Sequence, residues 1–340
     1  MKTSTQIEEA SLILGEEKAV EYVAKAGFDG WDFSMFAMCK YDWQSGKLLE
    51  NNHPLAGKDY LAFARRLKKI GLDNGIVCSQ SHAPFPSSCP EIRSYLKRAI
   101  ECTAEAGGEI CVIHPDNNKS AEENAEMYLE LLPFAREHNV KIATENMWNW
   151  DSEKDEACFA ACATPESFVK HVDAVNDDFL VACLDIGHAE MRGAGQGAAN
   201  TARALGRRLQ ALHIHDNDRW HDSHQIPFSM SIDFTAVVRA LKDIGYKGWF
   251  TLEADNYLKS FCKDNIIDGM KDLYSAVRRL ADMFEEEYND ILGSMQLEFG
   301  DDDYIVGWYA KNKKVIGCVI IRYLISEDDF FNIPGFPRRL

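Results

Sequence analysis

Histidine and acidic residues stand at the ends of a series of short apolar runs in this sequence. The runs are SQSHAP (His82), VIHPDN (His114), KIATENM (Glu145), ACLDIGH (Asp185, His188), ALHIHDND (His213, His215) and FTLEAD (Glu253). Carboxylate oxygens and imidazole nitrogens are ligands for divalent cations. Helix-length segments separate the runs, so the pattern predicts that distant parts of the chain bind a buried cation together, as in a metal-dependent enzyme.

Four of these residues form the expected metal site. They are Glu145, Asp185, His215 and Glu253, at the ends of four successive apolar runs. Three carboxylates and one imidazole make a hard, anionic site that suits Mn²⁺, Mg²⁺ or Co²⁺, with Zn²⁺ as an alternative. A structural zinc site would instead favour cysteine thiolates. His213 is expected to point the same way as His215, because residues two apart in a strand share a face.

A second set of polar and aromatic residues is expected around this site. The candidates for a second metal or for substrate binding are His82, His114, His213, Asp222, His224, Arg219, Trp31 and Trp148. Asp222 and His224 lie in the loop HDNDRWHDSH and could equally be surface residues. The tryptophans could line a pocket or fill the space between loops.

Apolar runs and helix-length segments alternate eight times along the chain. The predicted strands are 2–7, 29–34, 75–81, 109–114, 139–145, 180–186, 209–215 and 248–254, with helices between them. Such alternation is typical of parallel strands covered by helices. Ligands at the ends of several strands favour a closed α/β barrel, the (β/α)8 TIM barrel, whose active site lies at the C-terminal ends of its strands.

We expect residues 1–285 to form this catalytic barrel and residues 286–340 to form a small C-terminal extension. Antiparallel strands are predicted in the extension near 295–299, 304–310 and 314–324. Two long connections within the barrel, 35–56 and 146–164, leave strand ends and are expected to carry substrate loops. In the second connection, Cys158 and Cys162 are expected on a helix and without a metal, because no second cysteine pair accompanies them.

The net charge of −17 and the pI near 5.0 disfavour binding to nucleic acid and to anionic membranes. No apolar run approaches the roughly 20 residues of a membrane span. The N-terminal stretch lacks the basic and apolar regions of a signal peptide. The ten scattered cysteines are therefore expected to be reduced thiols in the cytoplasm.

At these residues the sequence resembles the xylose isomerase-like TIM-barrel superfamily, often labelled sugar phosphate isomerase/epimerase. The strings that carry the resemblance are AGFDGWDFSMF (26–36), SHAPF (81–85), VIHP (112–115), IATEN (142–146), LDIGH (184–188), LHIHDND (212–218) and FTLEA (250–254). The resemblance covers roughly residues 1–285. It implies that Glu145, Asp185, His215 and Glu253 match the metal ligands of ketose 3-epimerases, and that His188 contacts the substrate. It also allows a homo-oligomer.

The sequence departs from the ketose 3-epimerases at two places. Those enzymes carry an arginine six residues after the metal histidine, where this chain has His221, with Arg219 two residues earlier. The segment 226–234 also lacks their Pro-Gly-x-Gly. Contacts to the far end of a substrate are therefore not implied by the resemblance.

The same superfamily contains zinc AP endonucleases, which bind three zinc ions. Candidates for their nine ligands are His82, His114, Glu145, Asp185, His188, His215, Asp222, His224 and Glu253. An endonuclease also needs a basic surface for DNA, and this chain is strongly acidic.

The sequence thus predicts a metal-dependent isomerase or epimerase of a sugar or sugar phosphate that works through an enediolate. Glu145 and Glu253 are expected to move the proton, and His188 to hold a substrate oxygen. Two alternatives stay open: a zinc-dependent phosphodiester hydrolase of the AP endonuclease type, and a non-catalytic sugar-binding barrel. The expected partner is a small-molecule sugar, with neither nucleic acid nor membrane.

Overall fold

Eight parallel strands form the centre of the computed structural model, and they match the eight strands that the sequence predicts. The structure describes residues 1–293, 296–299, 305–311 and 314–321. The strands are β1 (Thr3–Gln6), β2 (Gly30–Ser34), β5 (Val77–His82), β6 (Ile110–Val112), β7 (Lys141–Glu145), β10 (Leu180–Asp185), β11 (Leu209–His213) and β12 (Phe250–Leu252). They pair in the order β11-β10-β7-β6-β5-β2-β1-β12.

The sheet closes on itself between its first and last strands. Ile214, directly after β11, forms a parallel bridge with Leu252 in β12. The Ile214 amide donates to the Thr251 carbonyl at 2.9 Å, and the Glu253 amide donates to the Ile214 carbonyl at 3.0 Å. The result is a (β/α)8 TIM barrel, which confirms the predicted fold class.

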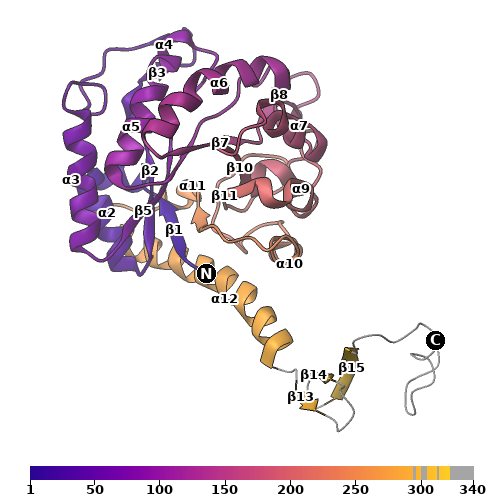
Figure 1. Cartoon of the computed structure of the whole chain (residues 1–340). Helices are drawn as coiled ribbons and strands as arrows, with labels where there is room; N and C mark the ends of the chain where they lie inside the picture. The colour runs from indigo at the N-terminus through magenta and orange to yellow at the C-terminus, as the bar shows by residue number, and fades with distance from the viewer. Residues whose placement is uncertain (294–295, 300–304, 312–313, 322–340) are drawn as a thin grey trace. The chain divides into compact units, whose positions relative to one another are not determined.

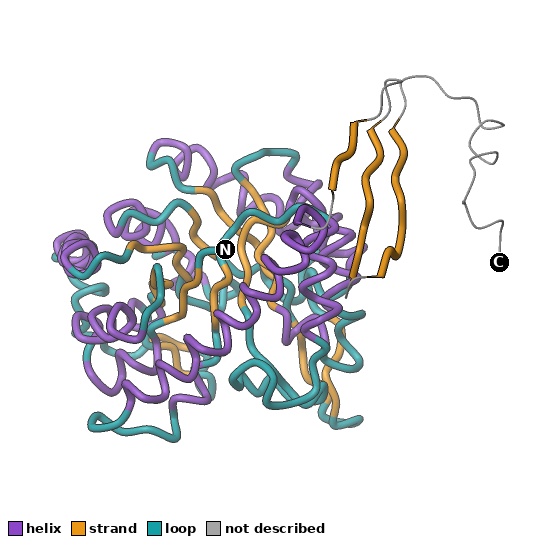
Figure 2. Tube along the Cα trace, turned by 90° about the horizontal axis from the view of Figure 1, so that it is seen from below, coloured by secondary structure: helices purple, strands orange, loops and turns teal. Residues whose placement is uncertain are grey.

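Helices enclose the strands, as Figures 1 and 2 show. They are α1 (Glu8–Leu14), α2 (Glu16–Ala26), α3 (Tyr60–Asp73), α4 (Pro90–Arg93), α5 (Leu96–Ala106), α6 (Ala121–Glu137), α7 (Pro165–Val175), α8 (Ile186–Glu190), α9 (Ala198–Leu205), α10 (Phe234–Asp243), α11 (Asp255–Leu258) and α12 (Ile266–Gly293). In α10, the Asp233 side chain accepts two backbone N–H bonds and fixes the start of the helix. Phe234, Val237 and Leu241 recur at helical spacing and form one buried face.

Small apolar side chains fill the inside of the barrel. Val112, Ala143, Val181, Cys183 and Ala211 form one buried cluster. Ala143, Cys183 and Ala211 each lie two residues before the polar residue that ends their strand. Because alternate residues of a strand share a face, this cluster lies inside the barrel beneath the polar strand ends.

Two antiparallel hairpins extend from the ends of barrel strands. After β2, β3 (Tyr41–Asp42) pairs with β4 (Lys47–Leu48), and after β7, β8 (Trp148–Asp151) pairs with β9 (Glu156–Phe159). They occupy the two long connections that the sequence predicts to carry substrate loops. The helix predicted at Cys158 and Cys162 is wrong. Cys158 lies in β9 and Cys162 has a positive φ of 62°, because the segment pairs with β8 across a turn.

The chain divides into two compact units, Met1–Met283 and Phe284–Leu340. Within the second unit, β13 (Gln296–Phe299), β14 (Ile305–Lys311) and β15 (Lys314–Ile321) form an antiparallel sheet, in agreement with the sequence. The predicted strand residues outside these bounds lie beyond the described residues.

Two observations bear on the environment of the protein. Within the described part of the chain, no helix is both long and apolar enough to cross a membrane. The nine cysteines whose side chains the structure describes are free thiols.

We expect Phe168→Ala to lower the free energy of unfolding by about 3–5 kcal/mol, because removing a buried aromatic ring leaves a cavity. Phe168 lies in α7 and is fully buried. Urea unfolding followed by circular dichroism measures the loss. Phe159→Ala is the matched control: Phe159 is 63% exposed, so its truncation should change stability by less than about 0.5 kcal/mol. Equal losses in the two variants would contradict this placement of the core.

Candidate metal centre and active site

The polar residues at the strand ends converge at the mouth of the barrel. His82, Glu145 and Asp185 are the last residues of β5, β7 and β10, and Glu253 directly follows β12. All four side chains are buried. They meet because the strands are parallel and their C-terminal ends share one face of the barrel.

Three carboxylates and one imidazole form a central group, made of Glu145, Asp185, Glu253 and His213. One ligand atom from each lies within 4.8 Å of the others. His213 Nδ1 is 3.2 Å from Glu145 Oε1 and 3.1 Å from Glu253 Oε2. The sequence predicts His215 at this place. His213 is closer to the two glutamates because it lies in β11, paired in register with Asp185, whereas His215 follows the strand and places Nε2 3.1 Å from Asp185 Oδ1.

A first flanking group consists of His82, His114 and Glu145. His82 Nε2 lies 2.7 Å from His114 Nε2, and His114 Nε2 lies 3.3 Å from Glu145 Oε2. Two imidazoles and one carboxylate make a set of ligands for a transition metal or zinc. Glu145 belongs to both groups, so its two oxygens can serve neighbouring cations.

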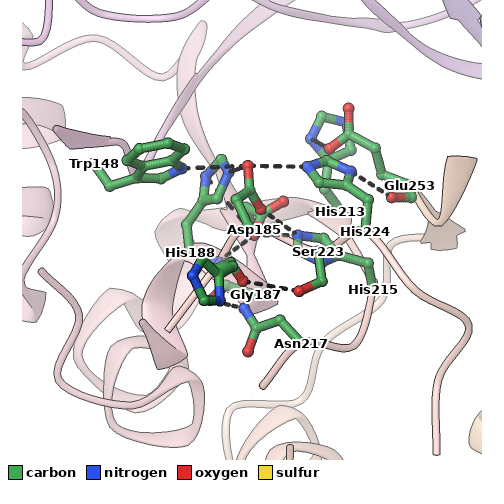
Figure 3. A network of polar contacts seen from close by, with 12 residues as sticks. Trp148, Asp185, Gly187, His188, His213, His215, Asn217, Ser223, His224 and Glu253 are labelled. Carbon is green, nitrogen blue, oxygen red and sulfur yellow. Dashed lines mark hydrogen bonds and ion pairs between the residues drawn. The ribbon is translucent and has the colours of Figure 1, made fainter. Parts of the chain in front are cut away.

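A second flanking group consists of His188, His215, Asp222 and His224. Asp222 Oδ2 lies 3.2 Å from His188 Nε2 and 3.1 Å from His224 Nε2. Asp222 Oδ1 lies 3.5 Å from His215 Nε2. Figure 3 shows the rings of His188 and His224 on either side of a shared carboxylate, with Trp148 at the edge of the network. The structure therefore brings the loop residues Asp222 and His224 to the barrel mouth.

Many buried polar atoms in these groups lack a hydrogen-bond partner. They are both carboxylate oxygens of Glu145, Asp185 Oδ2, Asp222 Oδ1, His82 Nδ1 and both ring nitrogens of His213. A buried polar atom without a partner costs about 1–3 kcal/mol, and such atoms in native proteins call for a specific explanation, for example a bound ion. Carboxylate oxygens and imidazole nitrogens are electron-pair donors, so the residues present fit a divalent cation.

The two glutamates of the central group have opposite pKa shifts. Burial disfavours the charged form of Glu145, but His213 and His114 outweigh it and hold the pKa of this carboxyl well below its usual range. Burial raises the pKa of Glu253 to about 8, against the opposing effect of His213. The surroundings therefore favour the charged form of Glu145 and the neutral form of Glu253, and a cation bound through Glu253 would displace its proton.

Two of the imidazoles also differ in charge. Burial and the nearby His114 hold the pKa of His82 well below its usual range, so its ring is neutral and can donate an electron pair. Burial opposes the charged form of His188, but Asp185 and Asp222 outweigh it and raise its pKa to about 10. A cation that binds the second flanking group through His188 must therefore displace a proton.

Residues that the sequence interpretation does not single out support the central group from below. Gln6 Nε2 donates to Glu253 Oε1 at 2.6 Å. Asp32 Oδ2 lies 3.4 Å from His213 Nε2 and accepts from Gln80 Nε2 at 2.9 Å. The signal was available in the sequence, because Gln6, Asp32 and Gln80 are polar residues inside the predicted strands 2–7, 29–34 and 75–81.

A cavity of about 650 Å³ opens above these groups. At its base lie His82, His114, Glu145, His188, Asp222, His224 and Glu253, and its walls carry the rings of Phe36, Tyr41, Trp43, Phe85, Trp148 and Trp150. Asp185, His213 and His215 are fully buried beneath it. The volume falls within the range of about 300–1,000 Å³ that small-molecule sites occupy.

Two residues predicted for substrate binding do not agree with the structure. Trp31 is fully buried next to Gly71 of α3, because it alternates with the inward-facing Asp32 and points toward the helices. Arg219 lies 3.6 Å from Glu190 and does not line the cavity. Trp148, in contrast, lines it as predicted.

Comparison with known proteins gives one family and several relatives. Residues 20–275 match the family described as xylose isomerase-like TIM barrel. An uncharacterised protein of Methanocaldococcus jannaschii is 26% identical over 258 residues, which are 70% of this chain and 78% of that protein. An uncharacterised protein of Sinorhizobium fredii is 28% identical over 178 residues, 48% of this chain and 54% of that protein.

Several solved structures of sugar epimerases have a similar fold. A D-tagatose 3-epimerase-like protein gives a TM-score of 0.62 at 22% identity, covering 85% of this chain and all (100%) of that one. An L-ribulose 3-epimerase gives a TM-score of 0.62 at 16% identity, covering 88% of this chain and 100% of that one. The 3-keto-D-glucoside 4-epimerase of E. coli gives a TM-score of 0.59 at 15% identity, covering 82% of this chain and 99% of that one. At such identities the likeness establishes the barrel fold.

We expect Gly187→Ala to weaken metal binding about 10- to 100-fold, the effect typical of displacing residues that orient ligands. A Cβ on Gly187 would lie 1.9 Å from Cε1 of His215, so the ring would have to move away from Asp185 and Asp222. Calorimetric titration with Mn²⁺ or Zn²⁺ measures the change. Gly57→Ala is the control, since the nearest atom to its added Cβ is 3.6 Å away. Unchanged affinity in the Gly187 variant would exclude His215 as a ligand.

Proposed function

Because this chain belongs to the xylose isomerase-like TIM barrel family, we propose that it is a metal-dependent isomerase or epimerase of sugars. The observation that carries the proposal is the pair of buried carboxyls, Glu145 and Glu253, which line the same cavity and lie 3.2 Å and 3.1 Å from the same ring nitrogen, Nδ1 of His213. Moving a proton at a carbon next to a carbonyl requires one group that accepts a proton and one that donates it. A protein that only binds a sugar needs no such pair.

The chain's own residues divide the proton transfer between them. The Glu145 carboxylate takes the proton from the carbon next to the substrate carbonyl. Glu253 returns a proton, to the opposite face of that carbon in epimerisation or to the former carbonyl carbon in isomerisation. In isomerisation the proton of the neighbouring hydroxyl also passes to the former carbonyl oxygen. Each turnover leaves Glu145 protonated and Glu253 ionised, and exchange with solvent restores the pair. His188 lines the cavity, and its Nε2, which lies 3.2 Å from Asp222 Oδ2, would turn its hydrogen bond to a substrate oxygen.

The central group also has the composition of a metal site. A divalent cation held by Glu145, Asp185, Glu253 and either His213 or His215 would polarise the substrate carbonyl and make the neighbouring C–H bond more acidic. Mn²⁺, Mg²⁺ or Co²⁺ suit the three carboxylates, and Zn²⁺ is an alternative. Gln6 and Asp32 hold Glu253 and His213 in place from below.

The similar solved structures support a sugar as the substrate, since they include epimerases of tagatose type, of ribulose and of a keto-glucoside. The free thiols at the described cysteines support the cytoplasmic location that the sequence predicts. Nucleic acid is not an expected partner, because the chain carries a net charge of −17.

Phosphodiester hydrolysis is a second candidate, and the two flanking groups favour it. The first contains three ligand residues, one of which, Glu145, is shared with the central group, and the second contains four, so the mouth could hold several cations. Hydrolases of phosphodiesters use two or more metal ions to stabilise the attacking and leaving oxygens. Against this candidate, the described residues that line the cavity include neither lysine nor arginine to bind further phosphates.

We expect Glu145→Gln to stop the incorporation of solvent deuterium into the substrate, because an amide cannot take the proton from the carbon next to the carbonyl. The exchange rate should fall by about 10²- to 10⁴-fold. The measurement is proton NMR of a panel of ketoses after incubation with metal-loaded protein in D₂O. Glu126→Gln is the control, because Glu126 is exposed on α6. Full exchange in the Glu145 variant would refute its role as the base.

Elemental analysis of the purified protein separates the two candidates. We expect about one manganese or magnesium ion per chain, bound at the central group. About three zinc ions per chain, one of which is lost in His224→Ala, would instead favour the hydrolase.

A further inference from the structure

The outer part of the cavity is built from aromatic rings that are partly exposed to solvent. We call Tyr41, Trp43, Phe85, Trp148 and Trp150 the aromatic collar; all five line the cavity. Trp43 is 67% exposed and Trp150 is 39% exposed. Exposed aromatic rings gathered at the mouth of a cavity typically mark a binding surface, because water solvates them poorly.

The two hairpins place these rings on different sides of the mouth. Tyr41 and Trp43 come from the β3–β4 hairpin after β2, whereas Trp148 and Trp150 lie in β8 after β7. Two strands, β5 and β6, separate β2 from β7 in the barrel. The rings of the collar therefore approach the cavity from opposing walls.

Ring contacts hold the collar in position. The centroids of Tyr41 and Trp43 are 5.0 Å apart at 87°, and those of Trp148 and Trp150 are 6.3 Å apart at 77°. Trp43 also lies 6.1 Å from Phe85. Edge-to-face pairs of this kind are favourable, so the rings are arranged before a ligand arrives.

The remaining cavity wall carries amides, hydroxyls and carboxylates. Its polar members outside the metal groups are Gln6, Ser87, Ser88, Asp116, Asn117, Asn118, Asn149 and Asp255. Among the described residues that line the cavity there is no lysine or arginine, the side chains that usually bind a phosphate group. A phosphate beyond the metal groups would meet carboxylates, whereas sugar hydroxyls can bond to the amides.

The cavity is also larger than one sugar unit requires. Its 650 Å³ lies within the range of sites for drug-sized ligands, and a single hexose has fewer than half the atoms of such a ligand. Aromatic faces beside amide groups suit a sugar ring, which has C–H groups on its faces and hydroxyls at its edge. The collar therefore has the space and the chemistry for a second ring.

We propose that the substrate is an uncharged carbohydrate of at least two sugar units, such as a disaccharide. The reacting unit lies over Glu145 and Glu253, and the next unit lies between the rings of the collar, with Trp43 and Trp150 as its main contacts. This inference rests on the proposed function and deepens it, because it excludes sugar phosphates and makes the hairpins determinants of specificity.

Binding measurements test the proposal separately from catalysis. Metal-loaded protein is titrated by calorimetry with a panel of disaccharides, their component monosaccharides, a phenyl glycoside and a hexose phosphate. We expect at least one disaccharide to bind roughly tenfold more tightly than its monosaccharides. Trp43→Ala and Trp150→Ala should remove that gain and leave monosaccharide binding unchanged.

Trp220→Ala is the matched control. Trp220 is 42% exposed, packs on Arg192 at 4.7 Å and does not line the cavity. This variant should keep the full gain from the second unit. An equal loss in this control would show that the effect of the collar variants is not specific to the cavity, and would overturn the role of the collar.

Three other results would overturn the proposal. They are equal affinity for disaccharides and monosaccharides across the panel, tightest binding of the hexose phosphate, and tighter binding of the phenyl glycoside than of every disaccharide. Deuterium exchange reports the proposed function independently. If deuterium exchanges into monosaccharides but a second sugar unit adds no affinity, the isomerase proposal stands and the role of the collar is refuted. If a second unit adds affinity that depends on Trp43 and Trp150 but no sugar exchanges deuterium, the role of the collar stands and the isomerase proposal is refuted.

Discussion

Burial of several carboxylates in one barrel mouth is the constraint on which the rest of this structure depends. Glu145, Asp185 and Glu253 are almost completely removed from water, and a buried carboxylate is costly unless positive charge or hydrogen-bond donors compensate for it. No lysine or arginine among the described cavity residues provides that charge. The surrounding imidazoles supply that charge, and under the proposed function a bound cation would add to it.

This requirement accounts for the distribution of histidine in the chain. Six of its ten histidines lie in the three groups at the barrel mouth. They can pair with the carboxylates as donors or release a proton and bind metal. The same arrangement separates the pKa values of Glu145 and Glu253, because the imidazoles of His213 and His114 stabilise the charge of Glu145 while burial dominates at Glu253. The proposed acid–base chemistry and metal binding would thus follow from one set of contacts.

The barrel and the place of its site could be predicted because both follow from the periodicity of the chain. Apolar runs separated by helices gave the eight strands, and parallel strands bring residues such as Glu145 and Asp185 together whatever their distance in sequence. The direction of individual side chains could not be predicted as well. Trp31 lies under α3 because Asp32 takes the inward position, and a sequence pattern alone does not reveal that a barrel interior accepts a carboxylate there. Which of His213 and His215 lies beside the two glutamates depends on where β11 ends and on how it pairs with β10, and the sequence pattern does not determine either.

The hairpins that carry the aromatic collar form two-stranded sheets of their own and add no strand to the barrel. Their sequences can therefore diversify without disturbing the strand register that holds the carboxylates and imidazoles. Evolution could retune which molecules this scaffold admits by mutating or exchanging two short insertions, while the reactive groups beneath are inherited unchanged. A family in which relatives share the barrel but differ in substrate is the expected outcome of that separation.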